Sequence, residues 1–163
     1  QKKLFTKNYF MNSFYEKTKG DYLISTDPSK LNVEVIHNYL SQESYWAKDI
    51  PFETVKKSIE HSLCFGLYYL QEQVGFARLI TDEATFAYLA DVFILKEYRG
   101  KDLSKFLLAT IQSHPELLNL RRWLLATKDA QGLYEQFGWT IFTEELSKKF
   151  MTLHNPDVYK KAE

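Results

Sequence analysis

The fold is decided by one stretch of the sequence, Asp91-Val92-Phe93-Ile94-Leu95-Lys96-Glu97-Tyr98-Arg99-Gly100-Lys101-Asp102-Leu103-Ser104-Lys105. It opens as an apolar strand, passes through a loop with one glycine and several cationic residues, and continues into a helix. Such a junction directs free backbone N–H groups and the positive end of a helix dipole at an anion. The residues alone leave two interpretations open, a phosphate-binding loop and a plain structural turn.

The residues before this junction predict three antiparallel strands. They are rich in aromatic and β-branched residues, and the polar breaks between them are short enough for hairpins. The predicted strands are Leu63–Leu70, Val74–Ile80 and Thr85–Leu95. Further upstream, the pattern predicts a short strand at Asp21–Thr26 and two helices, one along the apolar stripe Val33–Leu40 and one beginning at Pro51.

The residues after the loop alternate between helix and strand. We expect a helix over Asp102–His114, a buried strand over Arg122–Thr127, a helix capped by Asp129 that ends before Gly138, and a last strand over Trp139–Leu146. This order predicts an α/β fold, with a central mixed sheet and helices on both faces.

Composition excludes several classes of partner. Lys plus Arg and Asp plus Glu both number 21, so the chain has no net charge and no basic footprint for nucleic acid. No run approaches the roughly 18 apolar residues of a membrane span, and the first residues lack the apolar core of a signal peptide. The single Cys64 cannot form an internal disulfide. We therefore expect a soluble, cytoplasmic protein without nucleic-acid or membrane partners.

The sequence does not predict a metal site. Its four histidines are far apart, and no Cys or acidic pattern at ligand spacing accompanies them. Cys64 lies in an apolar run without a neighbouring base, which is typical of a buried structural thiol rather than a nucleophile.

Two segments resemble the signature segments of the GNAT (Gcn5-related N-acetyltransferase) superfamily, Val92–Lys105 and Leu133-Tyr134-Glu135-Gln136-Phe137-Gly138-Trp139. The similarity covers about residues 22 to 160 and is greatest to one bacterial branch. Further matching segments are Tyr45-Trp46-Ala47, Ile50-Pro51, Gly75–Arg78, Phe86–Val92 and Leu124–Ala130. The resemblance implies a GNAT-like acyl-CoA N-acyltransferase domain over residues 21–163, preceded by an N-terminal extension of uncertain role over residues 1–20.

The resemblance also implies a binding site for acetyl-CoA as co-substrate. In the superfamily the loop reads Arg/Gln-x-x-Gly-x-Gly/Ala, and its amides hold the pyrophosphate of coenzyme A. Its counterparts in this chain are Arg99, Gly100, Lys101, Asp102, Leu103, Ser104 and Lys105. The preceding strand pairs with the pantetheine arm and offers an N–H to the thioester carbonyl, a role implied for Val92, Phe93 and Ile94.

The loop departs from the superfamily pattern at two positions. Asp102 stands where the family has a glycine, and Ser104 stands where it has Gly or Ala. A carboxylate at the start of a helix can itself satisfy the free N–H groups, and it repels a pyrophosphate. Arg99, Lys101 and Lys105 can offset one negative charge. We expect acyl-CoA binding to be retained, with a weakened site.

The resemblance implies that Tyr134 protonates the departing thiolate of coenzyme A, a role suited to a phenol whose free pKa is about 10. The alternative is that Tyr134 belongs to the core. Asp91 interrupts an apolar strand and is a candidate base for the amine, and the alternative is that it pairs with Arg78 on a neighbouring strand. Tyr45 and Trp46 match the region that walls the acceptor pocket in the superfamily, or are core aromatics.

These observations favour an N-acetyltransferase that transfers an acetyl group directly from acetyl-CoA to a primary amine of a small-molecule or peptide acceptor. The alternative is a degenerate, non-catalytic acyl-CoA-binding or interaction module with the same fold. The sequence does not identify the acceptor or the acyl chain length, and it leaves both a monomer and a homodimer open.

Overall fold

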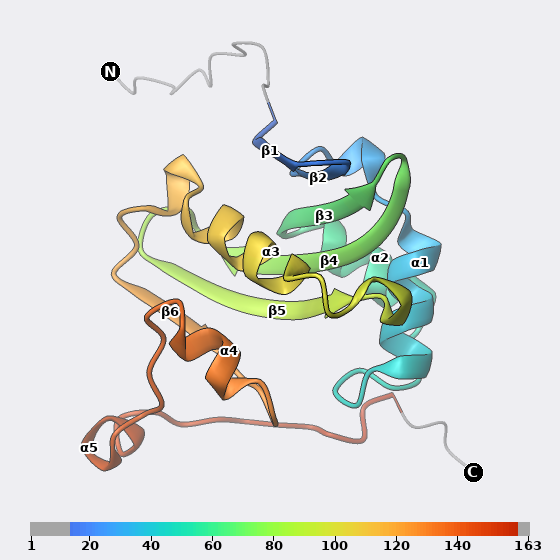
Figure 1. Cartoon of the computed structure of the whole chain (residues 1–163). Helices are drawn as coiled ribbons and strands as arrows, with labels where there is room; N and C mark the ends of the chain where they lie inside the picture. The colour runs from blue at the N-terminus through green and yellow to red at the C-terminus, as the bar shows by residue number, and fades with distance from the viewer. Residues whose placement is uncertain (1–13, 160–163) are drawn as a thin grey trace, which may run out of the picture.

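The computed structural model describes residues 14–159, and its elements are labelled in Figure 1. In this part of the chain, one sheet has the strand order β1-β2-β3-β4-β5-β6. Each neighbouring pair from β1 to β5 is antiparallel, and β6 is parallel to β5, so the sheet is mixed. The strands are β1 Glu16–Lys19, β2 Tyr22–Ser25, β3 Leu63–Tyr69, β4 Glu72–Thr81, β5 Phe86–Ile94 and β6 Arg122–Leu125.

Helices cover both faces of the sheet, as predicted (Figure 1). The α-helices are α1 Val33–Asn38, α2 Phe52–Glu60, α3 Leu103–Gln112, α4 Gln131–Glu135 and α5 Glu144–Ser147. Consecutive strand residues point to opposite faces, so Cys64 joins the cluster under α1 and α2 while Phe65 joins the one under α3. A π-helical segment η2, Tyr39–Glu43, continues α1.

α3 forms because its apolar residues recur at helical spacing and face the sheet. Leu107, Leu108 and Ile111 are fully buried, and each contributes about 1.5–3 kcal/mol by leaving water. The helix ends before His114, which precedes a proline and has an extended backbone (φ −64°, ψ 126°). The packing fixes the N-terminus of α3 next to the end of β5.

β5 is longer than its partner β6. Their pairing covers Phe86–Leu89 opposite Arg122–Leu125, and beyond it the residues of β5 up to Ile94 pair with β4 alone. Asp91 has a φ of 54° at the register shift opposite Phe76–Arg78, which is a β-bulge. Within the described residues, the C-terminal half of β5 therefore has a free edge.

The predicted last strand, Trp139–Leu146, is wrong. Residues 139–143 have no regular structure, and α5 follows them. Thr143 caps this helix by accepting from the Leu146 N–H at 3.2 Å, and Glu144 and Glu145 favour its positive end. These local helix signals prevail over the aromatic and β-branched pattern.

Three further expectations need correction. Asp129 does not cap α4, because the Thr127 hydroxyl accepts from the Ala130 N–H instead. The strand expected over Arg122–Thr127 ends at Leu125 and is only half-buried, since no described strand covers its outer edge. The sequence analysis also missed β1, because all four of its residues are polar and exposed. Between residues 14 and 159 no helix is long and apolar enough to span a membrane.

Candidate active site

The loop between β5 and α3, the predicted anion-binding segment, has two residues with left-handed backbone. Gly100 has a φ of 75° and Asp102 a φ of 56°, both in the left-handed region. Glycine reaches this region without strain, and aspartate is among the few other residues that tolerate it. Asp102 therefore retains the conformation that a glycine would supply at this position.

The Asp102 carboxylate does not cap α3, so the expectation that it satisfies the free N–H groups is wrong. It pairs instead with Lys105 Nζ at 3.2 Å, and its side chain is 68% exposed. No side chain caps the first turn of α3. Leu103 is buried in the core, so only its backbone faces the loop. The first-turn amides and the positive helix end are thus available to an anion.

Two more of the predicted loop residues are held by neighbours. Lys101 Nζ lies 5.1 Å from the ring centre of Tyr98. Arg99 turns back toward the sheet, where its Nε donates to the Ile94 carbonyl at 3.0 Å and its Nη2 donates to the Tyr39 hydroxyl at 3.1 Å. Ser104 is half-buried in the first turn of α3.

The free edge of β5 presents backbone groups beside this loop. The Leu95 N–H donates to the Val74 carbonyl on β4 at 2.8 Å. Because backbone groups alternate in direction along a strand, those of Val92 and Ile94 face the opposite, free edge. The side chain of Phe93 is buried between the sheet and Tyr39.

Tyr134 lies on α4 with its ring in the core and its hydroxyl unpaired. The residue is 8% exposed and packs edge-on against Trp139. Its hydroxyl has no hydrogen-bond partner between residues 14 and 159. Burial, together with the nearby Tyr45 phenol, raises the pKa of Tyr134 to about 12. The phenol is therefore protonated at neutral pH.

Asp91 is brought together with the two predicted acceptor residues. Its Oδ2 accepts from Arg78 Nε at 2.7 Å, and its Oδ1 accepts from Trp46 Nε1 at 3.0 Å. Tyr45 packs edge-on against Trp46, and its hydroxyl accepts from the Lys128 N–H at 2.9 Å. Tyr45 and Trp46 are 55% and 41% exposed, so they form a surface wall and not a core.

Sequence reasoning missed Tyr39 and Lys128. Tyr39 stacks on Phe93 with ring centres 3.9 Å apart and planes 10° apart, and it also contacts Trp46. Tyr39 is 60 residues from Arg99, so no local pattern could have linked them. Lys128 follows β6 and contacts Tyr45 twice, through its backbone N–H and through its Nζ, which lies 5.7 Å from the centre of the Tyr45 ring.

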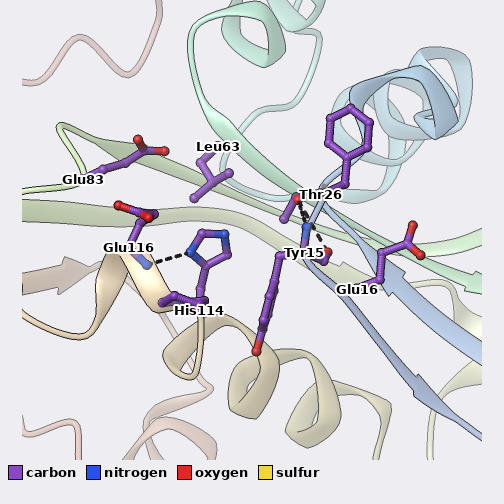
Figure 2. A pocket seen from close by; sticks show the side chains of 9 residues that line it. Tyr15, Glu16, Thr26, Leu63, Glu83, His114 and Glu116 are labelled. Carbon is purple, nitrogen blue, oxygen red and sulfur yellow. Dashed lines mark hydrogen bonds between the residues drawn. The ribbon is translucent and has the colours of Figure 1, made fainter. Parts of the chain in front are cut away.

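A pocket of about 660 Å³ lies at the other end of α3, near His114. Figure 2 shows Tyr15 and His114 facing one another in this pocket, with Glu83 and Glu116 on one side. It contains none of the predicted site residues, and its carboxylates would repel a diphosphate. Among residues 14–159, no group of three His, Cys, Asp or Glu side chains could hold a metal ion.

A family model described as an acetyltransferase (GNAT) domain matches residues 25–156, most of the chain. The chain belongs to the GNAT family. A presumed acetyltransferase of Gibberella zeae is 37% identical to this GNAT protein, over 72% of this chain and 77% of the relative.

Solved structures support the same assignment. A crystal structure of a presumed GNAT-family acetyltransferase from Xanthomonas campestris pv. campestris is 47% identical, with a TM-score of 0.82 over 86% of this chain and 97% of that chain. A GNAT family acetyltransferase from Elizabethkingia anophelis, solved with acetyl-CoA bound, is 12% identical, with a TM-score of 0.59 over 77% of this chain and 80% of that chain. The second likeness concerns the fold alone.

Proposed function

We propose that this GNAT protein transfers an acetyl group from acetyl-CoA directly to a primary amine of a small molecule or peptide in the cytoplasm. The observation that carries this proposal is the uncapped N-terminus of α3, which follows a loop with left-handed backbone at Gly100 and Asp102. An anion-binding turn of this kind, next to a free strand edge, fits a ligand that has a diphosphate and a long amide-bearing arm. Acetyl-CoA has both parts and supplies an acetyl group activated as a thioester.

The residues of the chain divide the work by position. The amides of the α3 first turn bind the diphosphate, with Lys101 and Lys105 adding positive charge. The free-edge groups of Val92 and the N–H of Ile94, whose carbonyl already accepts from Arg99, orient the arm, and an N–H there can stabilise developing negative charge on a carbonyl oxygen. Tyr134 is protonated at neutral pH, as any phenol is, and its hydroxyl is the candidate proton donor to the departing thiolate.

The aromatic wall of Tyr45 and Trp46 lies beside this edge and is the proposed boundary of the acceptor site. Trp46 is tied to Asp91, which lies on the bulge of β5. Holding an amine and a thioester together in one complex supplies much of the rate in such a transfer. Asp91 remains the candidate group for taking up the amine proton, directly or through water.

A thermal shift titration tests the proposal. Acetyl-CoA at about one hundred times its dissociation constant adds about 2.7 kcal/mol to stability, which for a chain of this size raises the melting temperature by roughly 5–10 °C. AMP at the same concentration is the control, because it lacks the diphosphate and the arm. Absence of any shift at millimolar acetyl-CoA would end the proposal.

The exposed carboxylate of Asp102 favours a second candidate, a non-catalytic acyl-CoA-binding module. A thiol-release assay across primary amines separates the two functions. Turnover supports the acetyltransferase, whereas a melting shift without turnover on any amine supports the binding module.

A further inference from the structure

The side chain of Arg99 joins three parts of the candidate site. Its Nε donates to the carbonyl of Ile94, the last residue of β5, and its Nη2 donates to the hydroxyl of Tyr39 in η2. Arg99 itself begins the loop that leads to Gly100 and Asp102. One guanidinium therefore connects the end of the free strand edge, the anion-binding loop and the π-helical segment.

Tyr39 is well placed to fix that guanidinium. It is 8% exposed, and its ring is stacked on Phe93 of β5 at 3.9 Å. A ring held in this way cannot swing with its hydroxyl, so the hydroxyl is a rigid acceptor. The backbone around it is also specialised, because Ser44 N–H donates to the Tyr39 carbonyl in the wide π-type turn, a feature frequent at functional sites.

Tyr39 also reaches the acceptor wall. Its ring lies 6.4 Å from that of Trp46, and Trp46 donates to Asp91. Tyr39 thus stands between the residues assigned to the amine and the loop assigned to the diphosphate. The sequence around Tyr39 gives no signal that predicts this position.

We propose that Tyr39 and Arg99 are positioning residues: Tyr39 orients the Arg99 guanidinium, which holds the start of the anion-binding loop against the end of β5. This inference rests on the proposed function. A planar guanidinium can bond two acceptors at once with fixed geometry, whereas a lysine ammonium is a point charge on a flexible stem. The role therefore requires the shape of arginine and not only its charge.

Binding of coenzyme A, measured by titration calorimetry, tests the inference through a double-mutant cycle. The variants are Tyr39→Phe, which keeps the stacked ring, Arg99→Lys, which keeps the charge, and the double variant. We expect each single change to weaken coenzyme A binding about 3- to 10-fold and the double change to weaken it no further, because both break one linkage. Unliganded melting temperatures should stay close to that of the wild-type protein.

Salt dependence provides the readout that separates loss of side-chain geometry from loss of positive charge. Because Tyr39→Phe and Arg99→Lys keep every cation, the slope of binding against salt should match the wild-type slope. Lys101→Met, which removes an exposed loop cation, should lower the slope.

Three outcomes overturn the inference: wild-type affinity in Tyr39→Phe, wild-type affinity in Arg99→Lys, or losses that multiply in the double variant. These failures leave the proposed function intact as long as wild-type protein binds coenzyme A. Wild-type protein that does not bind coenzyme A would overturn both proposals.

Discussion

Asp91 and Arg78 form an ion pair of 2.7 Å between β5 and β4, with side chains only 10% and 15% exposed. The other carboxylate oxygen of Asp91 accepts from Trp46. Both oxygens of the carboxylate are therefore engaged in hydrogen bonds. The pair joins the bulge of β5 to the proposed acceptor wall.

Asp91→Asn should lower the free energy of unfolding by about 1–3 kcal/mol, because it leaves the largely buried Arg78 guanidinium without a counter-charge. Urea denaturation measures this loss. Glu144→Gln is the matched control, since its 2.7 Å pair with Lys148 is exposed and worth at most about 0.5 kcal/mol. Unchanged stability with a hundredfold loss of turnover would instead assign Asp91 as the base.

Tyr134→Phe should preserve folding and acetyl-CoA affinity while lowering the single-turnover rate about ten- to a thousandfold, within the range of general acid catalysis. The hydroxyl has no partner among the described residues, so its removal breaks no internal hydrogen bond. Tyr22→Phe, on β2, is the control and should keep its rate. A normal single-turnover rate in Tyr134→Phe would leave Tyr134 as a core residue.

Asp102→Gly and Asp102→Asn should both bind coenzyme A more tightly than the wild-type protein, because each removes a negative charge from the anion-binding loop. Both residues accept the φ of 56° found at this position. Asp102→Ala also loses the charge but should cost about 1–2 kcal/mol of stability, since alanine is strained there. Calorimetric titration and thermal unfolding separate the two effects, and weaker binding by Asp102→Asn would contradict the electrostatic argument.

Tyr68→Phe should raise the free energy of unfolding by about 1 kcal/mol, because it removes a polar group buried without compensation. Tyr68 is 4% exposed, and its hydroxyl has no partner between residues 14 and 159. Burial also raises the pKa of this phenol. Chemical denaturation measures the gain, and a loss of stability would indicate a hydrogen bond to bound water.

Cys64 should not react with thiol reagents at pH 8 in the folded protein. The residue is 6% exposed, and burial raises the pKa of its thiol to about 12. Because the folded pKa exceeds the unfolded one, this group's contribution to stability is complete below about pH 9 and is lost as pH rises toward 12. Labelling in the presence and absence of urea checks this, and rapid labelling without urea would contradict it.

Local signals in the sequence predicted the helices and strands that form the centre of the fold. Pro51 and Pro115 mark the beginning of α2 and the end of α3, and the apolar stripe of α3 matches its buried face. The strand predicted over Trp139–Leu146 failed because its second half has a helix cap and acidic residues, and Lys148 and Lys149 follow at helical spacing from Glu144 and Glu145.

The sequence predicted only the part of the candidate site that lies within one continuous segment. The proposed anion-binding loop was predictable from a strand, a glycine and a helix start that follow one another in sequence. The direction of the Asp102 carboxylate was not predictable from the sequence. An aspartate at a helix start can cap the helix, or it can pair with a lysine one turn later, as Asp102 pairs with Lys105. The contacts of Tyr39 with Arg99 and of Tyr45 with Lys128 join residues 60 and 83 positions apart, so they depend on the folded sheet.

The polar strand β1 bears on how the protein behaves at high concentration. Among the described strands it is one of the two edge strands, all of its residues are exposed, and three of the four are charged. Charged outer strands discourage the backbones of separate molecules from pairing. In a shortened chain beginning at Asp21, β2 would become the edge strand of the sheet, and it contains the apolar residues Leu23 and Ile24. Such a chain should aggregate in concentrated solution, where the longer one stays dispersed.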